Sequence, residues 1–148
     1  MEVNKAGKDL IKSFEGCKLK AYKCPAMLDT IGYGSTFYED GTKVKAGDVI
    51  TQERANQLFE LIVEDFAKKV KPLIKQDITD NNFSALVSYA YNVGVNNLKN
   101  STLLKKVNVN PKDPTIAAEF KKWVRANGKV LNGLVKRREA EAKLYEQL

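Results

Sequence analysis

The chain of 148 residues has a hydrophobic fraction of 43% and a formal net charge of +7. This length suits one ordinary domain with a sizeable core, and the hydrophobic fraction is that of a globular protein, so we exclude a disordered chain. The absence of histidine excludes Ser–His and Cys–His nucleophilic pairs and imidazole metal sites. Acid–base chemistry must therefore come from carboxylates, thiols, tyrosine or lysine.

The cysteines and the N-terminal segment limit the kinds of site and location that we expect. Cys17 and Cys24 are too few for a four-ligand zinc site, and we expect no metal or other cofactor. The first residues, MEVNKAGKDLIKSFEG, lack the apolar core of a secretory signal, and no apolar run is long enough to span a membrane. We therefore expect reduced cysteines, with a Cys17–Cys24 disulfide as the alternative. The positive charge suits an anionic partner, but no nucleic-acid-binding signature accompanies it.

The start of the chain predicts a short helix that ends on a carboxylate. Apolar residues at positions 6, 10, 11 and 14 have the spacing of an amphipathic helix over 5–14. Gly16 is expected to end this helix, which leaves Glu15 in the last turn. The helix dipole disfavours an anion at this end, so this position favours the protonated form that a general acid needs.

Residues 17–48 are rich in turns and predict a small sheet. The β-prone pieces are Leu19–Tyr22 and Thr30–Tyr33, and Asp40-Gly41 is typical of a tight hairpin turn. We expect two or three antiparallel strands over about 18–46.

From Thr51 onward the apolar residues recur at the three- and four-residue steps of helices. We predict one domain over 1–148, α+β and mainly α, with a small β lobe (about 15–50), a helical lobe (about 51–148 with the helix 5–15) and a cleft between them. Trp123 is expected mainly in the core. The expected helices cover 51–70, a segment from Thr79 or Asp80 to Gly94, 101–107, a segment from Asp113-Pro114 through Trp123 to near Gly128, and 132–147.

Arg138 interrupts the apolar stripe of the last predicted helix. A buried arginine keeps its charge and needs an anionic partner. Three alternatives remain open: a pair with Glu141 on the same helix, a side-chain stem that reaches solvent, and a pair with Glu15.

The stretch around Glu15 resembles a known family. Glu15, Cys24 and Thr30 have the spacing of the T4-type phage lysozymes (glycoside hydrolase family 24), whose motif is a Glu, eight residues, an Asp or Cys, five residues and a Thr. The resemblance continues through the segments LKAY, TIGYG, YNVG, KNS and GLVKRR, and therefore covers nearly the whole chain. It implies a lysozyme-like fold and hydrolysis of the β-1,4 bond between N-acetylmuramic acid and N-acetylglucosamine in peptidoglycan.

The resemblance also implies roles for individual residues. Glu15 would be the general acid, Cys24 the residue on the base side, and Thr30 the holder of the attacking water. Asp29 is the alternative base, although strand alternation turns it away from the face that Thr30 occupies. The resemblance places substrate contacts at Thr36, Tyr91, Asn92, Asn100 and Ser101, where helix capping and core packing are the alternatives for the last four, and it gives Arg138 a supporting role.

The same residues are also compatible with two other functions. Cys24, together with Ser35 where the family usually has His, suggests a wall-binding module without catalysis. A lytic transglycosylase would use Glu15 alone. The resemblance further implies a monomer that acts on peptidoglycan glycan strands, binds no nucleic acid, does not insert stably into a membrane, and stays in the host bacterial cytoplasm until a phage holin releases it to the wall.

Overall fold

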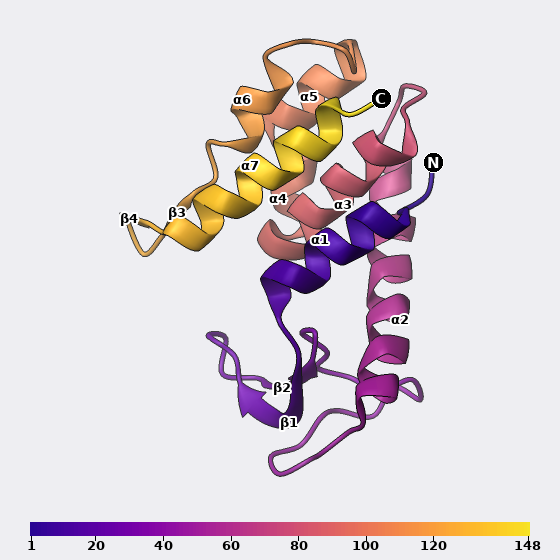
Figure 1. Cartoon of the computed structure of the whole chain (residues 1–148), viewed down its shortest axis with the longest axis vertical. Coiled ribbons are helices and arrows are strands. Elements are labelled where there is room, and N and C mark those ends of the chain that lie inside the picture. The colour runs from indigo at the N-terminus through magenta and orange to yellow at the C-terminus, as the bar shows by residue number, and fades with distance from the viewer. The chain divides into compact units, whose positions relative to one another are not determined.

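A computed structural model describes all 148 residues, and the fold is α+β and mainly helical (Figure 1). The chain forms two units, one of Glu15–Asp65 and the other of Met1–Phe14 with Phe66–Leu148. In chain order the elements are α1 (Lys5–Glu15), β1 (Lys18–Lys23), β2 (Asp29–Gly32), α2 (Gln52–Val70), the 3₁₀ turn η1 (Lys71–Leu73), α3 (Asp80–Val93), α4 (Val95–Lys99), α5 (Thr102–Val109), α6 (Ile116–Phe120), β3 (Arg125–Ala126), β4 (Lys129–Val130) and α7 (Asn132–Glu146).

The first helix ends where the sequence predicts. α1 ends at Glu15, and the next residue, Gly16, has a φ of 68°. A left-handed residue after the last helical position is a common way to end a helix, and glycine adopts it without steric cost. Glu15 is therefore held at the point where the chain leaves α1 for β1.

A small antiparallel sheet organises the unit of Glu15–Asp65. β1 pairs with β2 so that Tyr22 lies opposite Thr30 and Lys23 opposite Asp29. Isolated bridges at Lys20–Val49, Ile31–Ser35 and Phe37–Lys43 extend the pairing as far as residue 49, which confirms the predicted sheet. The apolar core of this unit consists of Ile31, Val44, Ile50, Ala55 and Leu58.

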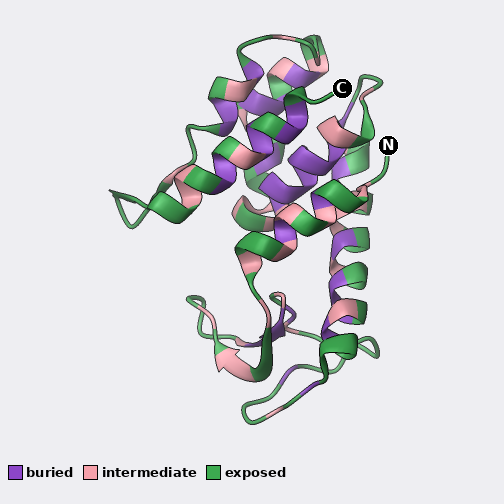
Figure 2. Cartoon of the chain, viewed as in Figure 1, coloured by how far each residue is buried: buried purple, intermediate pink, exposed green.

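The other unit is built around α3, whose central residues are almost all buried (Figure 2). Thr79 caps this helix: its side chain accepts a hydrogen bond from the Asn82 backbone N–H, and the Asn82 side chain accepts one from the Thr79 backbone N–H. Thr79, rather than Asp80, is therefore the N-cap. α3 packs against α7, and α7 packs in turn against α6.

Close packing of α1 against α3 explains why glycine occurs at position 7 of the chain, although glycine lowers the stability of a helix. A Cβ added at Gly7 would lie 2.5 Å from Cβ and 2.7 Å from Oγ of Ser84, which bonds Asn4. Gly7→Ala gains about 1 kcal/mol of helix propensity but forces these helices apart, at a cost of about 1–3 kcal/mol.

We therefore expect Gly7→Ala to lower the free energy of unfolding by about 1 kcal/mol, the opposite sign from an open helix position. Gly133→Ala is the matched control, because a Cβ at Gly133 on α7 meets nothing within 4 Å. Urea denaturation measures both variants. A more stable Gly7→Ala protein would show that the close approach carries no constraint.

Arg138 belongs to a buried charge cluster in α7 and α3. Its side chain is fully buried, and its Nε lies 2.7 Å from Oε1 of Glu141. Glu141 Oε2 also accepts hydrogen bonds from the Ser88 hydroxyl (2.5 Å) and from Nε of Arg137 (3.3 Å). The Arg138 guanidinium additionally lies 4.9 Å from the Tyr89 ring centroid. The pair within α7 is therefore the alternative that the structure shows.

The predicted helix from Asp113-Pro114 through Trp123 to near Gly128 is wrong. The helix covers only Ile116–Phe120, and a β-hairpin of β3 and β4 follows. Asn127 and Gly128 have φ values of 52° and 78°, which is the Asn-Gly turn of a two-residue hairpin. Trp123 lies before this hairpin with 42% of its surface exposed, so its expected place in the core is also wrong.

Candidate functional site

The three residues of the motif lie in one unit, at the ends of adjacent elements. Glu15 is the last residue of α1, Cys24 follows the end of β1, and Thr30 lies in β2. The β1–β2 connection folds back on itself, because the Cys24 N–H donates to the Leu28 carbonyl (3.0 Å) and the Met27 N–H to the Cys24 carbonyl (2.8 Å). The turn therefore brings Cys24 back beside β2.

Cys24 and Thr30 are direct partners. Hydrogen bonds from the Thr30 hydroxyl and from the Leu28 backbone lower the pKa of the Cys24 thiol. The Thr30 side chain is buried, and its Oγ1 lies 2.9 Å from the Leu28 carbonyl oxygen. A hydroxyl has one proton, so Thr30 donates it to the sulfur when Cys24 is ionised and to the carbonyl otherwise. The arrangement favours a thiolate.

Tyr22 connects the acid and the thiol electrostatically, although no role for this residue was predicted. Burial raises the pKa of Tyr22, and the negative charges of Glu15 and Cys24 raise it further. Both groups therefore lie within electrostatic range of one phenol, which stays protonated and can donate a hydrogen bond near them. Its position opposite Thr30 in the sheet register was the signal that could have identified it.

Asp29 has a different environment from Thr30. Its carboxylate is 3.0 Å from Lys23 Nζ, and both residues line a groove of about 240 Å³. Thr36 lines the same groove, so the structure brings Thr36 together with Asp29. The exposed apolar side chains of Met27, Leu28 and Phe37 also line it, together with Lys43 and Val44.

The other predicted contact residues belong to the helical unit. Tyr91 is half-buried and stacks on Phe66 with ring centroids 5.1 Å apart. The Ser101 hydroxyl accepts from the Leu104 N–H (3.0 Å) and donates to the Leu98 carbonyl (2.6 Å), so it caps α5. Asn92 is exposed at the end of α3, and Asn100 is the C-cap of α4. The structure therefore shows packing for Tyr91 and helix capping for Ser101, which are the alternatives to sugar contact that the sequence left open.

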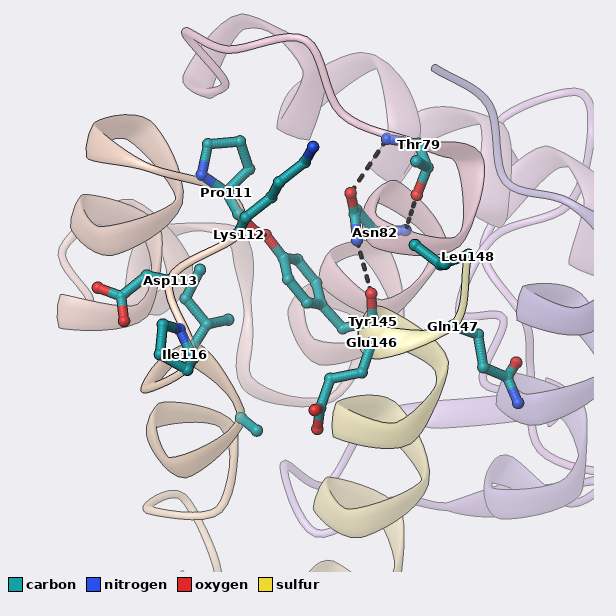
Figure 3. A pocket seen from close by; sticks show the side chains of 12 residues that line it. Thr79, Asn82, Pro111, Lys112, Asp113, Ile116, Tyr145, Glu146, Gln147 and Leu148 are labelled. Atoms are coloured by element: carbon teal, nitrogen blue, oxygen red, sulfur yellow. Dashed lines mark hydrogen bonds between the residues drawn. The ribbon is translucent and has the colours of Figure 1, made fainter.

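Figure 3 shows a separate cavity of about 330 Å³ at the C-terminal end of α7, in the helical unit. The Asn82 side chain crosses it and donates to the Tyr145 carbonyl at 2.6 Å. The Tyr145 hydroxyl donates to the Pro111 carbonyl at 2.7 Å. None of the predicted site residues lines this cavity, and its polar groups serve to join α3, α7 and the segment before α6.

Both cysteines are free thiols, so the alternative of a Cys17–Cys24 disulfide is wrong. No group of three or more acidic or cysteine side chains is arranged to hold a metal ion. None of the helices has the length and apolar character needed to cross a bilayer.

A glutamate at the end of the first helix, a small antiparallel sheet directly after it and a helical remainder define a lysozyme-like fold. Residues 12–141 match the family described as phage lysozyme, and the chain belongs to that family. It is 46% identical over 147 residues to the endolysin of Bacillus phage B103, covering 98% of this chain and 54% of that protein. The chain thus spans about half the length of that relative.

Two solved structures share the fold over nearly the full length of both chains. The endolysin from Escherichia coli O157:H7 phage FAHEc1 superposes with a TM-score of 0.88 at 39% identity, covering 99% of this chain and 94% of that one. The muramidase domain of SpmX from Asticaccaulis excentricus superposes with a TM-score of 0.87 at 30% identity, covering 99% of each chain. The architecture predicted from the sequence is therefore confirmed.

Proposed function

We propose that this protein is an endolysin that hydrolyses the β-1,4 bond between N-acetylmuramic acid and N-acetylglucosamine in peptidoglycan. The observation that carries the proposal is the contact of Cys24 with Thr30, with both Cys24 and Glu15 in range of Tyr22. Membership of the phage lysozyme family and similarity to a domain named muramidase support the substrate class.

In the proposed reaction Glu15 protonates the glycosidic oxygen as the bond breaks. Cys24, as a thiolate, takes a proton from the attacking water or stabilises the positive charge of the oxocarbenium-like transition state. The Thr30 hydroxyl holds the thiolate and orients the water, and Tyr22 stays neutral beside both charges. Thr36, Tyr91, Asn92, Asn100 and Ser101 remain the proposed sugar contacts, and Arg138 supports the site only through the packing of α7.

We propose Cys24 rather than Asp29 as the base. Asp29 forms an ion pair with Lys23, whereas the Cys24 thiol has a lowered pKa beside Thr30. We expect Cys24→Ser to lower the rate of wall lysis roughly 10²-fold, because a serine hydroxyl does not ionise near neutral pH. Cys24→Asp restores an anion at that position and should retain most of the activity.

Asp29→Asn provides the comparison, with initial rates of turbidity loss as the measurement. A strong loss in Asp29→Asn with a mild one in Cys24→Ser would assign the base to Asp29.

Analysis of the reaction products tests the proposed function. Purified peptidoglycan digested by the wild-type protein should yield fragments with reducing N-acetylmuramic acid ends, identified by mass spectrometry. Anhydromuramic ends would instead establish a lytic transglycosylase. Binding to the wall without any soluble fragment would establish a non-catalytic module.

The name endolysin shared by its relatives supports a further part of the proposal. The protein acts as a monomer on glycan strands and reaches the wall from the host cytoplasm when a holin opens the membrane. Release of the expressed protein only upon co-expression of a holin would support this route, and spontaneous lysis without one would contradict it.

A further inference from the structure

The positive charge of this chain is concentrated in one short segment. Residues 121–138 contain seven lysines and arginines and no acidic residue. The chain has 25 basic and 18 acidic residues, so the remainder has 18 of each and is neutral. The whole net charge of +7 therefore resides in these eighteen positions.

Five of these seven cations are at the surface. Arg137 and Arg138 are buried in α7 with Glu141, whereas Lys121, Lys122, Arg125, Lys129 and Lys136 are exposed. Lys122 pairs with Glu119 at 2.8 Å. The other four have no carboxylate within ion-pair distance, so their charges are available to a ligand.

The β3–β4 hairpin carries two of these cations, Arg125 and Lys129, on an arm. It projects beyond the start of α7 (Figure 1) and is exposed along its length (Figure 2). Arg125 lies opposite Val130 and Ala126 opposite Lys129, and opposite residues point to the same face. Each face of the hairpin therefore carries one cation. The turn of Asn127 and Gly128 joins the two strands.

Exposed apolar side chains accompany the cations. Trp123, just before β3, is 42% exposed, and Val130, on the face of Arg125, is 52% exposed. Leu131 is 44% exposed and lies opposite Val124, whose carbonyl accepts its N–H at 3.0 Å, on the other face. An element that inserts into a bilayer needs its apolar groups on a single side. The arm has exposed apolar groups on both faces, which favours as its ligand a polymer that runs along the arm.

We propose that the segment 121–136, which we call the hairpin arm, binds the phosphodiester polymer of a bacterial wall. The choice of partner rests on the proposed function, which brings the protein to the wall. A polymer with one phosphate in every repeat contacts several cations of the arm at once and releases counterions from each contact. Arginine and lysine both bind phosphate oxygens well, and the indole ring of Trp123 packs on the repeat between two phosphates.

The chain carries its own reporter for this binding. Trp123 is the only tryptophan, so its fluorescence reports contacts at the hairpin arm alone. Titration of the full chain with poly(glycerol phosphate) should change this fluorescence with an apparent affinity that falls steeply as salt is added. The measurement requires no catalysis, so its outcome is independent of whether the protein cleaves peptidoglycan.

Charge variants test whether the hairpin arm is the binding site of the polymer. R125Q/K129Q removes two cations from the hairpin and should weaken binding roughly tenfold. The matched control, K71Q/K105Q, removes two exposed lysines of the same unit that have no ion pair, and should change affinity less than about twofold. Equal losses in both variants would overturn the proposal, because they would show a response to net charge alone.

Comparison with other polyanions tests which partner binds the hairpin arm. An oligonucleotide with the same number of phosphates that binds more tightly than poly(glycerol phosphate) would replace the wall polymer with nucleic acid. A fluorescence change only with anionic lipid vesicles would assign a membrane surface. Unchanged retention on purified walls after their phosphodiester polymer has been hydrolysed away would likewise overturn the proposal, and loss of retention would support it.

Discussion

Replacement of Glu15 by glutamine is expected to remove wall lysis while the fold stays intact. Glutamine keeps the shape of the side chain at the end of α1 but has no proton to give to the glycosidic oxygen. General acid catalysis contributes about 10²–10⁴-fold to a rate, and a glycosidase has no second donor in this role. We therefore expect the initial rate of turbidity loss to fall by about 10³-fold or more.

A matched control separates the loss of general acid catalysis from the loss of one negative charge. Glu53→Gln removes an exposed carboxylate from the first turn of α2 in the same unit, and should keep nearly full activity. Both variants should show the circular dichroism spectrum of the wild-type protein. Lysis by Glu15→Gln at a rate comparable with that of Glu53→Gln would exclude Glu15 as the general acid.

The largest effect on stability is expected at Glu141. This carboxylate is fully buried, and it pairs with both Arg137 and Arg138 while accepting a hydrogen bond from the Ser88 hydroxyl. Burial raises the pKa of Glu141, and the two guanidinium groups oppose that shift. Glu141→Gln removes the charge and leaves the buried Arg138 guanidinium without its counter-ion, which costs about 3–5 kcal/mol.

For a chain of this length such a loss lowers the melting temperature by about 10 °C. Glu139→Gln is the control, because Glu139 is an exposed neighbour on α7 and its loss should shift the transition by no more than about 1 °C. The double replacement Arg138→Met with Glu141→Leu should be more stable than Glu141→Gln, since it removes charges of both signs. A Glu141→Gln protein with wild-type stability would show that the cluster is dispensable.

Local rules were sufficient for much of this fold because the relevant signals are short-range. Gly16 ends α1 through its own backbone freedom, and Thr79 caps α3 through bonds to residues three positions away. The spacing of Glu15, Cys24 and Thr30 also survives folding as a local arrangement, because one β-hairpin carries Cys24 and Thr30. The closeness of Cys24 to Thr30 could therefore be predicted from the sequence, and their catalytic roles remain a proposal.

The errors of prediction had two different causes. The stretch after α6 has helical spacing up to Trp123, but the two left-handed residues of an Asn-Gly turn favour a hairpin instead. The partner of Arg138 was left open between Glu141, Glu15 and solvent. The structure pairs Arg138 with Glu141 three residues further along α7, and Ser88 of α3 donates a hydrogen bond to that carboxylate.

The sequence by itself determined the family, the helix that ends at Glu15, the small sheet after it, and the absence of histidine chemistry. Tertiary structure decided which groups meet: Thr30 with Cys24, Lys23 with Asp29, and Glu141 with Arg138. The reason is physical. Turns and caps depend on neighbouring residues in the chain, whereas the ionisation of a thiol or a carboxylate depends on side chains that folding brings within a few ångströms.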